Sequence, residues 1–246
     1  MTQSSLDPSP EAVRAVAPGG TLRAAINLGN VVLAQRAADG ALEGVAVRLA
    51  QLAAGRLGRP LELVPFEAAG RVLDGLQRDA WDLAFLAIDP LRAEQVCFTQ
   101  PYVVIDSTYL VREDAPCKTV AEVDSPGTRV AASRGSGYEL HLRRALRHAE
   151  LLALPTPEEA FRAFQEGAAE VLAGVRPALL RYSAGQAGLR VLAEPFLAVR
   201  HALALPRRAA QALPWLDAFI EQARRTGEVH RALAETGRAD AATVPV

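Results

Sequence analysis

Residues 81–102 read WDLAFLAIDPLRAEQVCFTQPY, and this stretch indicates the class of fold. Asp82 to Ile88 is almost wholly apolar, as expected of a parallel strand that is covered on both faces. Asp89 can cap a short helical turn with Pro90 at its first position. Arg92 then projects back toward the strand end, where its guanidinium could hold a carboxylate in two parallel hydrogen bonds. A surface salt bridge is the other interpretation of this arginine.

Short apolar runs alternate with stretches of helical period on both sides of this strand. The predicted strands of the first half are Leu22 to Ile26, Leu61 to Phe66 and Asp82 to Ile88, and those of the second half are Arg129 to Ser133, Leu151 to Leu154 and Glu170 to Val175. Predicted helices separate them, so each half has the order βαβαβ. The sequence therefore predicts an α/β protein with two lobes of roughly 90 residues each.

Two extended segments connect the halves of the chain. Val103 to Glu113 and Val199 to Leu205 are β-prone and show no helical period, so we expect two crossing strands that form a hinge. The expected division is a polar leader over residues 1–20, a first lobe over 20–105 plus 199–246, and a second lobe over 106–198. Two lobes joined in this way enclose a cleft, and ligand groups gather at the carboxyl ends of parallel strands.

Polar residues follow several of these strands. Asn27 and Asn30 supply neutral donors and acceptors after the first strand, although turn chemistry explains them equally well. Ser136 opens a helix in the second lobe, where free N–H groups and the helix dipole face an anion. Arg176 follows the third strand of that lobe and is expected to face the same cleft as Arg92. Ordinary solvation at a helix start is the alternative for Arg176.

Composition argues against several classes of protein. The 246 residues carry 27 Lys and Arg against 28 Asp and Glu, a net charge of -1, which is unlike a nucleic-acid-binding protein. No apolar run reaches about 18 residues, so we expect a soluble chain that is not membrane-inserted. Residues 1–20 lack the features of a secretory signal. Lys118 is the only lysine and no phosphate loop is present, which excludes Walker-type nucleotide hydrolysis.

No catalytic or metal-binding pattern is evident. Cys97 and Cys117 match no redox or metal motif and are interpreted as unpaired thiols. His141 lies seven residues from the next histidine, too far for a metal site without further ligands. His201 lies in the return crossing, where a hinge or structural role is favoured. Glu67 is the one carboxylate placed to reach the cleft as a general acid or base, and neither a cofactor nor a metal is expected.

The stretch from Trp81 to Tyr102 resembles the signature of the bacterial extracellular solute-binding proteins of family 3, the polar-amino-acid-binding components of ABC transporters. In that family a strand ending in small residues leads through a helical turn to an arginine, and a Phe-Thr-x-Pro-Tyr stretch follows. Residues 40–58, GALEGVAVRLAQLAAGRLG, resemble the first helix of the family. The resemblance covers about residues 20 to 237. It implies a type II periplasmic-binding-protein-like fold whose two lobes close on a ligand.

By position, the resemblance places Arg92 on the ligand carboxylate, helped by the backbone N–H of Ala87. Ser136 and Gly137 match the second-lobe residues that complete this carboxylate site. The expected ligand-binding residues are Asn27, Asn30, Phe85, Ala87, Arg92, Ser136, Gly137, Tyr138 and Arg176.

Departures from the family pattern point to the kind of ligand. The family usually holds the ligand ammonium with an aspartate at a position that is Val175 here, followed by Arg176. Asn30 stands where an aromatic commonly covers the ligand side chain, and Ala84 and Phe85 stand where serines are usual. Burying an unpaired ammonium costs several kcal/mol. The expected ligand is therefore an anionic carboxylate, such as a dicarboxylate or a keto acid.

The resemblance implies a non-catalytic binding protein with a small carboxylate ligand and an ABC permease as partners, located in the periplasm. Because residues 1–20 lack an export signal, either a leader has been removed or the protein works inside the cell, where it could sense or buffer a metabolite. Some proteins of this fold are dehydratases, so an enzyme acting on a hydroxy carboxylate through Glu67 is an alternative. A further alternative is an interaction module, in which the ligand controls closure of the lobes and thereby the binding of a partner.

Overall fold

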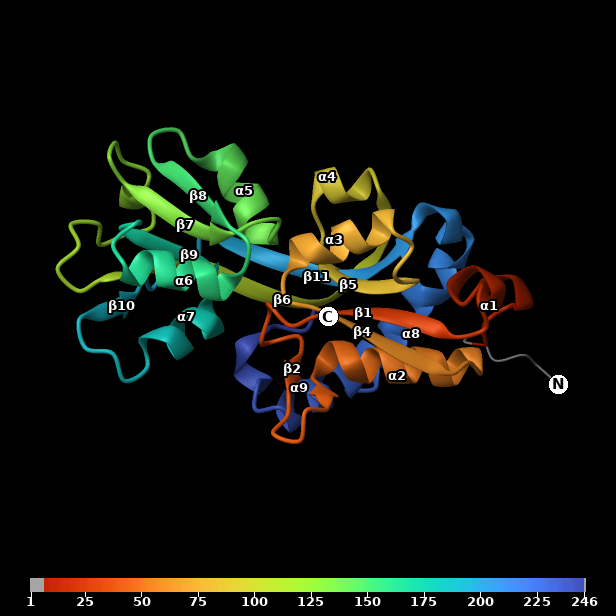
Figure 1. Cartoon of the computed structure of the whole chain (residues 1–246). Coiled ribbons are helices and arrows are strands. Elements are labelled where there is room, and N and C mark those ends of the chain that lie inside the picture. Colours follow the sequence, from red (N-terminus) through yellow and green to blue (C-terminus); the bar gives the residue numbers. More distant parts are fainter. Residues whose placement is uncertain (1–6, 246) are drawn as a thin grey trace.

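The computed structural model describes residues 7–245 and has two lobes that share one mixed sheet (Figure 1). Within these residues the strands follow the order β4-β1-β5-β11-β6-β9-β7-β8, with β10 paired to β6. The strands of the sheet are β1 (Leu22–Asn27), β4 (Leu61–Phe66), β5 (Leu83–Ala87), β6 (Val96–Arg112), β7 (Arg129–Ser133), β8 (Glu150–Leu154), β9 (Val171–Val175), β10 (Leu189–Val191) and β11 (Leu197–Pro206). The first lobe holds β1, β4 and β5 in parallel, and the second holds β7, β8 and β9 in parallel. The predicted α/β fold is confirmed.

The strands β6 and β11 belong to both lobes. They pair with each other in antiparallel register from Leu197 opposite Ser107 to Pro206 opposite Val96. β11 also pairs with β5, and β6 also pairs with β9, so these two strands join the halves of the sheet. The expected hinge of two crossing strands is present. β6 begins before the predicted crossing because its first residues pair with the end of β11.

Helices cover the sheet on both faces, as the apolar runs predict (Figure 1). The helices of the first lobe are α2 (Val45–Leu57), α3 (Ala69–Gln77), α4 (Pro90–Ala93), α8 (Leu213–Arg225) and α9 (Glu228–Glu235), and those of the second lobe are α5 (Gly137–Ala145), α6 (Pro157–Gln165) and α7 (Arg176–Ser183). A small hairpin of β2 (Gln35–Arg36) and β3 (Leu42–Glu43) precedes α2. The chain after β11 returns to the first lobe, where α8 and α9 bury their apolar faces.

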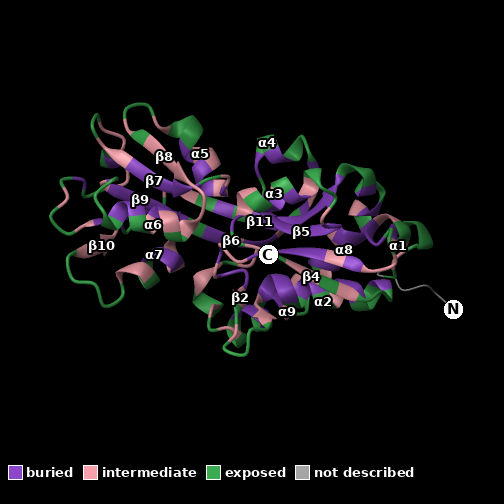
Figure 2. Cartoon of the chain, viewed as in Figure 1, coloured by how far each residue is buried: buried purple, intermediate pink, exposed green. Residues whose placement is uncertain are grey.

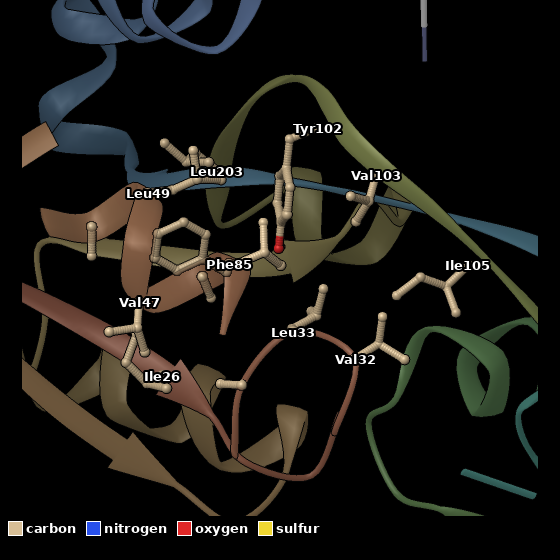
Figure 3. Close-up of a cluster of buried hydrophobic side chains, with 14 of the residues drawn as sticks. Ile26, Val32, Leu33, Val47, Leu49, Phe85, Tyr102, Val103, Ile105 and Leu203 are labelled. Atoms are coloured by element: carbon tan, nitrogen blue, oxygen red, sulfur yellow. The ribbon is translucent and has the colours of Figure 1, made fainter. Parts of the chain in front are cut away.

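An apolar cluster supports β5 from the face that α2 covers (Figure 3). Figure 2 shows that the central strands are buried along most of their length. Phe85 and Tyr102 meet edge to face there, with ring centroids 6.0 Å apart. The Tyr102 hydroxyl has no hydrogen-bond partner within residues 7–245, and burial raises its pKa above the usual range. This packing fixes the strand from which the arginine of the cleft is presented.

The helix α1 (Pro10–Val16) lies within the segment that the sequence analysis treats as a polar leader. Ser9 caps it by accepting a hydrogen bond from the backbone N–H of Ala12 at 3.1 Å, and Pro10 occupies its first turn. Ala12 and Val16 are buried, and the helix packs against the 3-10 turn at Arg207–Ala212. The helix was not expected because tertiary packing, which a short local pattern does not reveal, stabilises it.

Candidate functional site

A cavity lies between the two lobes, at the carboxyl ends of β1 and β5 on one side and of β7 and β9 on the other. It leaves about 30 Å³ for the centres of water-sized molecules, which is room for about two waters. Every expected ligand-binding residue except Arg176 lines it. The complete lining is Asn27, Gly29, Asn30, Ala69, Phe85, Leu86, Ala87, Arg92, Ser133, Ser136, Gly137, Tyr138, Pro157, Val175, Val199 and His201.

The Arg92 guanidinium is buried in this cavity, with the residue only 1% exposed. Its Nη1 donates to the carbonyl of Ala87 at 2.8 Å, and its Nη2 donates to the carbonyl of Gly135, across the cleft, at 2.5 Å. Its Nε has no partner within residues 7–245. Burial lowers the pKa of Arg92 to about 10, although the negative charges of Asp89 and Glu139 act to raise it. The guanidinium is therefore charged at neutral pH, and its Nε–H is left without a partner.

Asp89 sets the turn that presents this arginine. Its backbone is extended, and its Oδ1 accepts from the backbone N–H of Leu91 at 2.9 Å, while Pro90 occupies the first turn of α4. Its Oδ2 accepts from Nη2 of Arg144, in the second lobe, at 2.8 Å. The same carboxylate thus caps α4 and forms an ion pair between the lobes.

The second lobe presents the start of α5 to the cavity. Ser136 is the N-cap, and its Oγ accepts from the backbone N–H of Glu139 at 3.1 Å. The buried Glu139 carboxylate accepts from the backbone N–H of Gly135 at 3.0 Å and also pairs with Arg143. Burial raises the pKa of Tyr138 to about 12, so its phenol is neutral. This end of the cavity therefore carries hydroxyl and backbone groups but no free charge.

Glycines bring the two backbones together at the closed cleft. A Cβ on Gly137 would lie 2.7 Å from the Cβ of Ala87 in the first lobe, and a Cβ on Gly70 would lie 2.9 Å from the carbonyl oxygen of Arg134. Both distances are shorter than real Cβ contacts allow. The lobes therefore pack against each other without intervening space at these points.

His201 is a cavity residue that the sequence analysis assigned to a hinge or structural role. It lies on β11 opposite Ala87, and it is 6% exposed. Its Nε2 is 3.4 Å from Nδ2 of Asn30, whose Oδ1 accepts from the backbone N–H of Val32 at 3.2 Å. The signal in the sequence is a pair of polar residues, Arg200 and His201, in an otherwise apolar strand, and only the strand register shows that His201 faces the cavity.

The electrostatics of the cavity keep His201 neutral. Burial is the larger cause and the positive charge of Arg92 the second, and together they lower the pKa of His201 to about 3. The backbone of Val199 has the smallest effect and raises the pKa of His201. It does not reach hydrogen-bond geometry with the ring, so Nδ1 has no hydrogen-bond partner within residues 7–245. The ring is neutral throughout the physiological range.

Two residues expected at the cleft lie elsewhere. Arg176 is the first residue of α7, and its guanidinium donates to the carbonyls of Leu192 at 3.1 Å and Ala193 at 2.7 Å. It lines a separate cavity together with Asp106 and Arg238. Glu67 is exposed and does not line the cavity between the lobes. In both cases the strand end is correctly located, but the side chain does not line the cavity.

Within residues 7–245, no group of His, Cys, Asp and Glu side chains is arranged to hold a metal ion. No helix in the same part of the chain combines the length and the hydropathy required to cross a bilayer.

Comparison with known proteins agrees with this geometry. A profile of the bacterial extracellular solute-binding proteins, family 3, matches residues 22–236. The chain is also 26% identical over 176 residues to a cyclohexadienyl dehydratase of Pseudomonas aeruginosa, a match that covers 70% of this chain and 65% of that enzyme. The chain thus spans just under two thirds of the curated relative.

Solved structures of amino-acid-binding proteins superimpose on nearly the whole chain. An amino acid ABC transporter substrate-binding protein from Streptococcus pneumoniae, bound to L-arginine, is 25% identical, with a TM-score of 0.77 and coverage of 95% of this chain and 99% of that one. A cysteine-binding protein from Campylobacter jejuni is 18% identical, with a TM-score of 0.80 and coverage of 96% and 99%. An ancestral amino acid-binding protein, described as a precursor of cyclohexadienyl dehydratase, is 22% identical, with a TM-score of 0.75 and coverage of 92% and 98%.

Proposed function

Since the chain belongs to the bacterial extracellular solute-binding proteins, family 3, we propose that its cavity binds a small anionic carboxylate without chemically changing it. The protein would serve as the substrate-binding component of an ABC-type uptake system or as a sensor. One observation carries the proposal. The acceptor oxygens of Asn27, Asn30 and Ser136 are occupied by backbone N–H groups, whereas Nε–H of Arg92 and the side-chain amide group of Asn27 remain for a ligand.

The asparagines and the serine illustrate this arrangement. Oδ1 of Asn27 accepts from the backbone N–H of Gly29 at 3.0 Å, which leaves the Asn27 amide group to donate. Oδ1 of Asn30 and Oγ of Ser136 are also occupied by backbone N–H groups. Arg92 adds a positive charge and a free Nε–H. A ligand rich in acceptors, such as a carboxylate, satisfies these donors, and a buried donor left unsatisfied is costly.

An ammonium finds no partner in the same cavity. Val175 occupies the end of β9 and supplies no charge. The two carboxylates whose charges act on Arg92 are already engaged: Asp89 accepts from Leu91 and Arg144, and Glu139 accepts from Gly135 and Arg143. Each would have to release these bonds to neutralise a ligand ammonium. This favours a ligand that carries negative charge only.

Closure of the lobes would trap such a ligand. We propose that residues 20–105 with 199–246, and residues 106–198, move as two bodies about β6 and β11. A ligand stabilises the closed state only through contacts that the open state lacks. Arg92 from one lobe and Ser136 from the other would supply them when a single anion touches both.

The direct test is to identify what the protein binds. Native mass spectrometry of freshly purified protein should reveal a copurified carboxylate. Isothermal titration calorimetry with mono- and dicarboxylates, keto acids, arginine and cysteine should show binding of the acids that lack an ammonium. Tight binding of arginine or another basic amino acid, with no binding of any acid that lacks an ammonium, would refute the proposal.

A dehydratase acting on a hydroxy carboxylate is the second candidate, and the similarity to cyclohexadienyl dehydratase favours it. The cavity supplies little for such chemistry, because no aspartate, glutamate or lysine lines it and His201 is held neutral at a pKa of about 3. Glu67 would need to move into the cleft. A spectroscopic assay for the unsaturated product, with Glu67→Gln as the matched variant, decides between the candidates: turnover by the native protein that the variant loses would establish the enzyme.

A further inference from the structure

His201 is the buried cavity group that a carboxylate site alone does not explain. It lies opposite Ala87 in the sheet, and the Ala87 carbonyl holds Nη1 of Arg92. The imidazole and the guanidinium are therefore neighbours on the same wall of the cavity. A ligand whose carboxylate binds Arg92 would therefore meet the imidazole on the same wall of the cavity.

The hydrogen bonds around Asn30 determine which ring nitrogen of His201 carries the proton. Oδ1 of Asn30 accepts from the backbone N–H of Val32, so its Nδ2 must be the atom that faces Nε2 of His201. Since Nδ2 only donates, Nε2 is the acceptor and the proton resides on Nδ1. This Nδ1–H is the donor that lacks a partner within residues 7–245.

We infer that His201 is a specificity-determining residue whose Nδ1–H donates to an oxygen on the carbon next to the ligand carboxylate, so that the cavity selects 2-oxo and 2-hydroxy acids over 2-amino acids. The inference rests on the proposed function, because Arg92 must hold the carboxylate. An oxo or hydroxyl oxygen accepts this hydrogen bond, whereas an ammonium has no lone pair with which to accept it. Neutrality of the ring keeps Nε2 available to Asn30.

Two matched series of acids test the selection by calorimetry: propionate, lactate, pyruvate and alanine, and glutarate, 2-hydroxyglutarate, 2-oxoglutarate and glutamate. In at least one series, the native protein should bind the oxo or hydroxy acid at least about 10-fold more tightly than the acid without that oxygen, and should bind the amino acid most weakly. If the acids bind but the added oxygen does not raise the affinity, or if the amino acid binds most tightly, the inference fails and the proposal of carboxylate binding stands. If no acid binds, both fail together.

Variants of His201 separate a specificity role from a structural one. His201→Phe keeps a ring without a donor and should reduce the preference for the oxo or hydroxy acid, taken as the ratio of affinities within one series, to less than about 3-fold. His201→Asn retains an amide close to the position of Nδ1 and should keep the preference, whereas His201→Gln should not. Equal weakening of all acids in every variant would mean that His201 only supports the structure.

A measurement on the native protein avoids any doubt about folding of the variants. Nitrogen-15 NMR of labelled histidine should show the Nδ1–H form of His201 and a shift of Nδ1 when an oxo acid is added. The simple acid should leave that signal nearly unchanged. An Nε2–H form in the free protein would overturn the assignment of the donor.

Discussion

The two lobes present an arginine at corresponding strand ends, but only one of the two enters the cleft. In the first lobe, β5 leads through Asp89 and Pro90 to Arg92, which is buried between the lobes. In the second lobe, β9 leads directly into α7, and Arg176 turns to the carbonyls of Leu192 and Ala193. An arginine at the end of a strand is thus not sufficient for a site.

The difference arises from the turn between the strand and the helix. The capped turn at Asp89 sets Arg92 three residues into α4, so its side chain returns over the strand end. Arg176 is the first residue of its helix, and its guanidinium reaches the backbone carbonyls of Leu192 and Ala193 in the segment before β11. The local geometry of the turn, and the carbonyls that lie within reach of the guanidinium, decide which arginine serves the cavity.

Removal of the two arginines gives the largest predicted contrast. Arg92→Ala should weaken binding of the carboxylate found by mass spectrometry by about 2–5 kcal/mol, because it deletes one member of a buried charged pair. Arg176→Ala should change binding by less than about 0.5 kcal/mol, as expected of a substitution outside the site. Calorimetry on both variants measures the contrast, and thermal melting verifies that each is folded. Equal losses would place Arg176 at the ligand after all.

Closure of the cleft depends on Gly137, which faces Ala87 across the lobes. A methyl group there would overlap the first lobe, so Gly137→Ala should cost the closed state about 1–3 kcal/mol, the usual range for overpacking. Ligand affinity should fall accordingly, and small-angle scattering should show a larger radius of gyration. Gly55→Ala is the control, because no atom lies within 4 Å of its added Cβ. Unchanged affinity in Gly137→Ala would mean that binding does not require this closed state.

The neutral state of His201 predicts how stability depends on pH. Its pKa is lowered from 6.5 to about 3 in the folded protein, so the unfolded chain binds the additional proton as the pH falls below 6.5. The contribution is complete above pH 6.5 and is lost on acidification, by about 1.4 kcal/mol per pH unit down to about pH 3. Denaturant unfolding between pH 7 and 4.5 should show a steeper loss for the native protein than for His201→Phe. Parallel curves would contradict the burial of a neutral ring.

The ion pair between Asp89 and Arg144 should have the smallest effect. The Arg144 side chain is 45% exposed, so solvent screens the pair and its contribution to closure should be below about 1 kcal/mol. Arg144→Gln removes the charge, and Asp89→Asn keeps an oxygen to cap α4. A double-mutant cycle on ligand affinity isolates the coupling between them. A coupling above about 2 kcal/mol would make this pair a principal latch of the closed state.

Much of the fold is readable from local patterns. The apolar run at Asp82–Ile88 predicts β5, and Asp89 with Pro90 predicts the turn that the structure shows. The helix α1 was not foreseen, because its short pattern gains stability only from packing against the turn at Arg207–Ala212. The end of the second-lobe strand at Val175 was placed correctly, but the direction of the Arg176 side chain was not.

The sequence by itself determined the order of strands and helices, the capped turn before Arg92 and the glycines and hydroxyls at the start of α5, because hydrophobic period and capping act between near neighbours in the chain. Only the tertiary structure decided that His201 faces the cavity and that Arg176 does not. The position of His201 follows from the register of β11 against β5, a pairing between segments more than 100 residues apart. The direction of Arg176 follows from carbonyls that a later segment brings beside it. Contacts of this kind depend on the folded chain and leave no local signal.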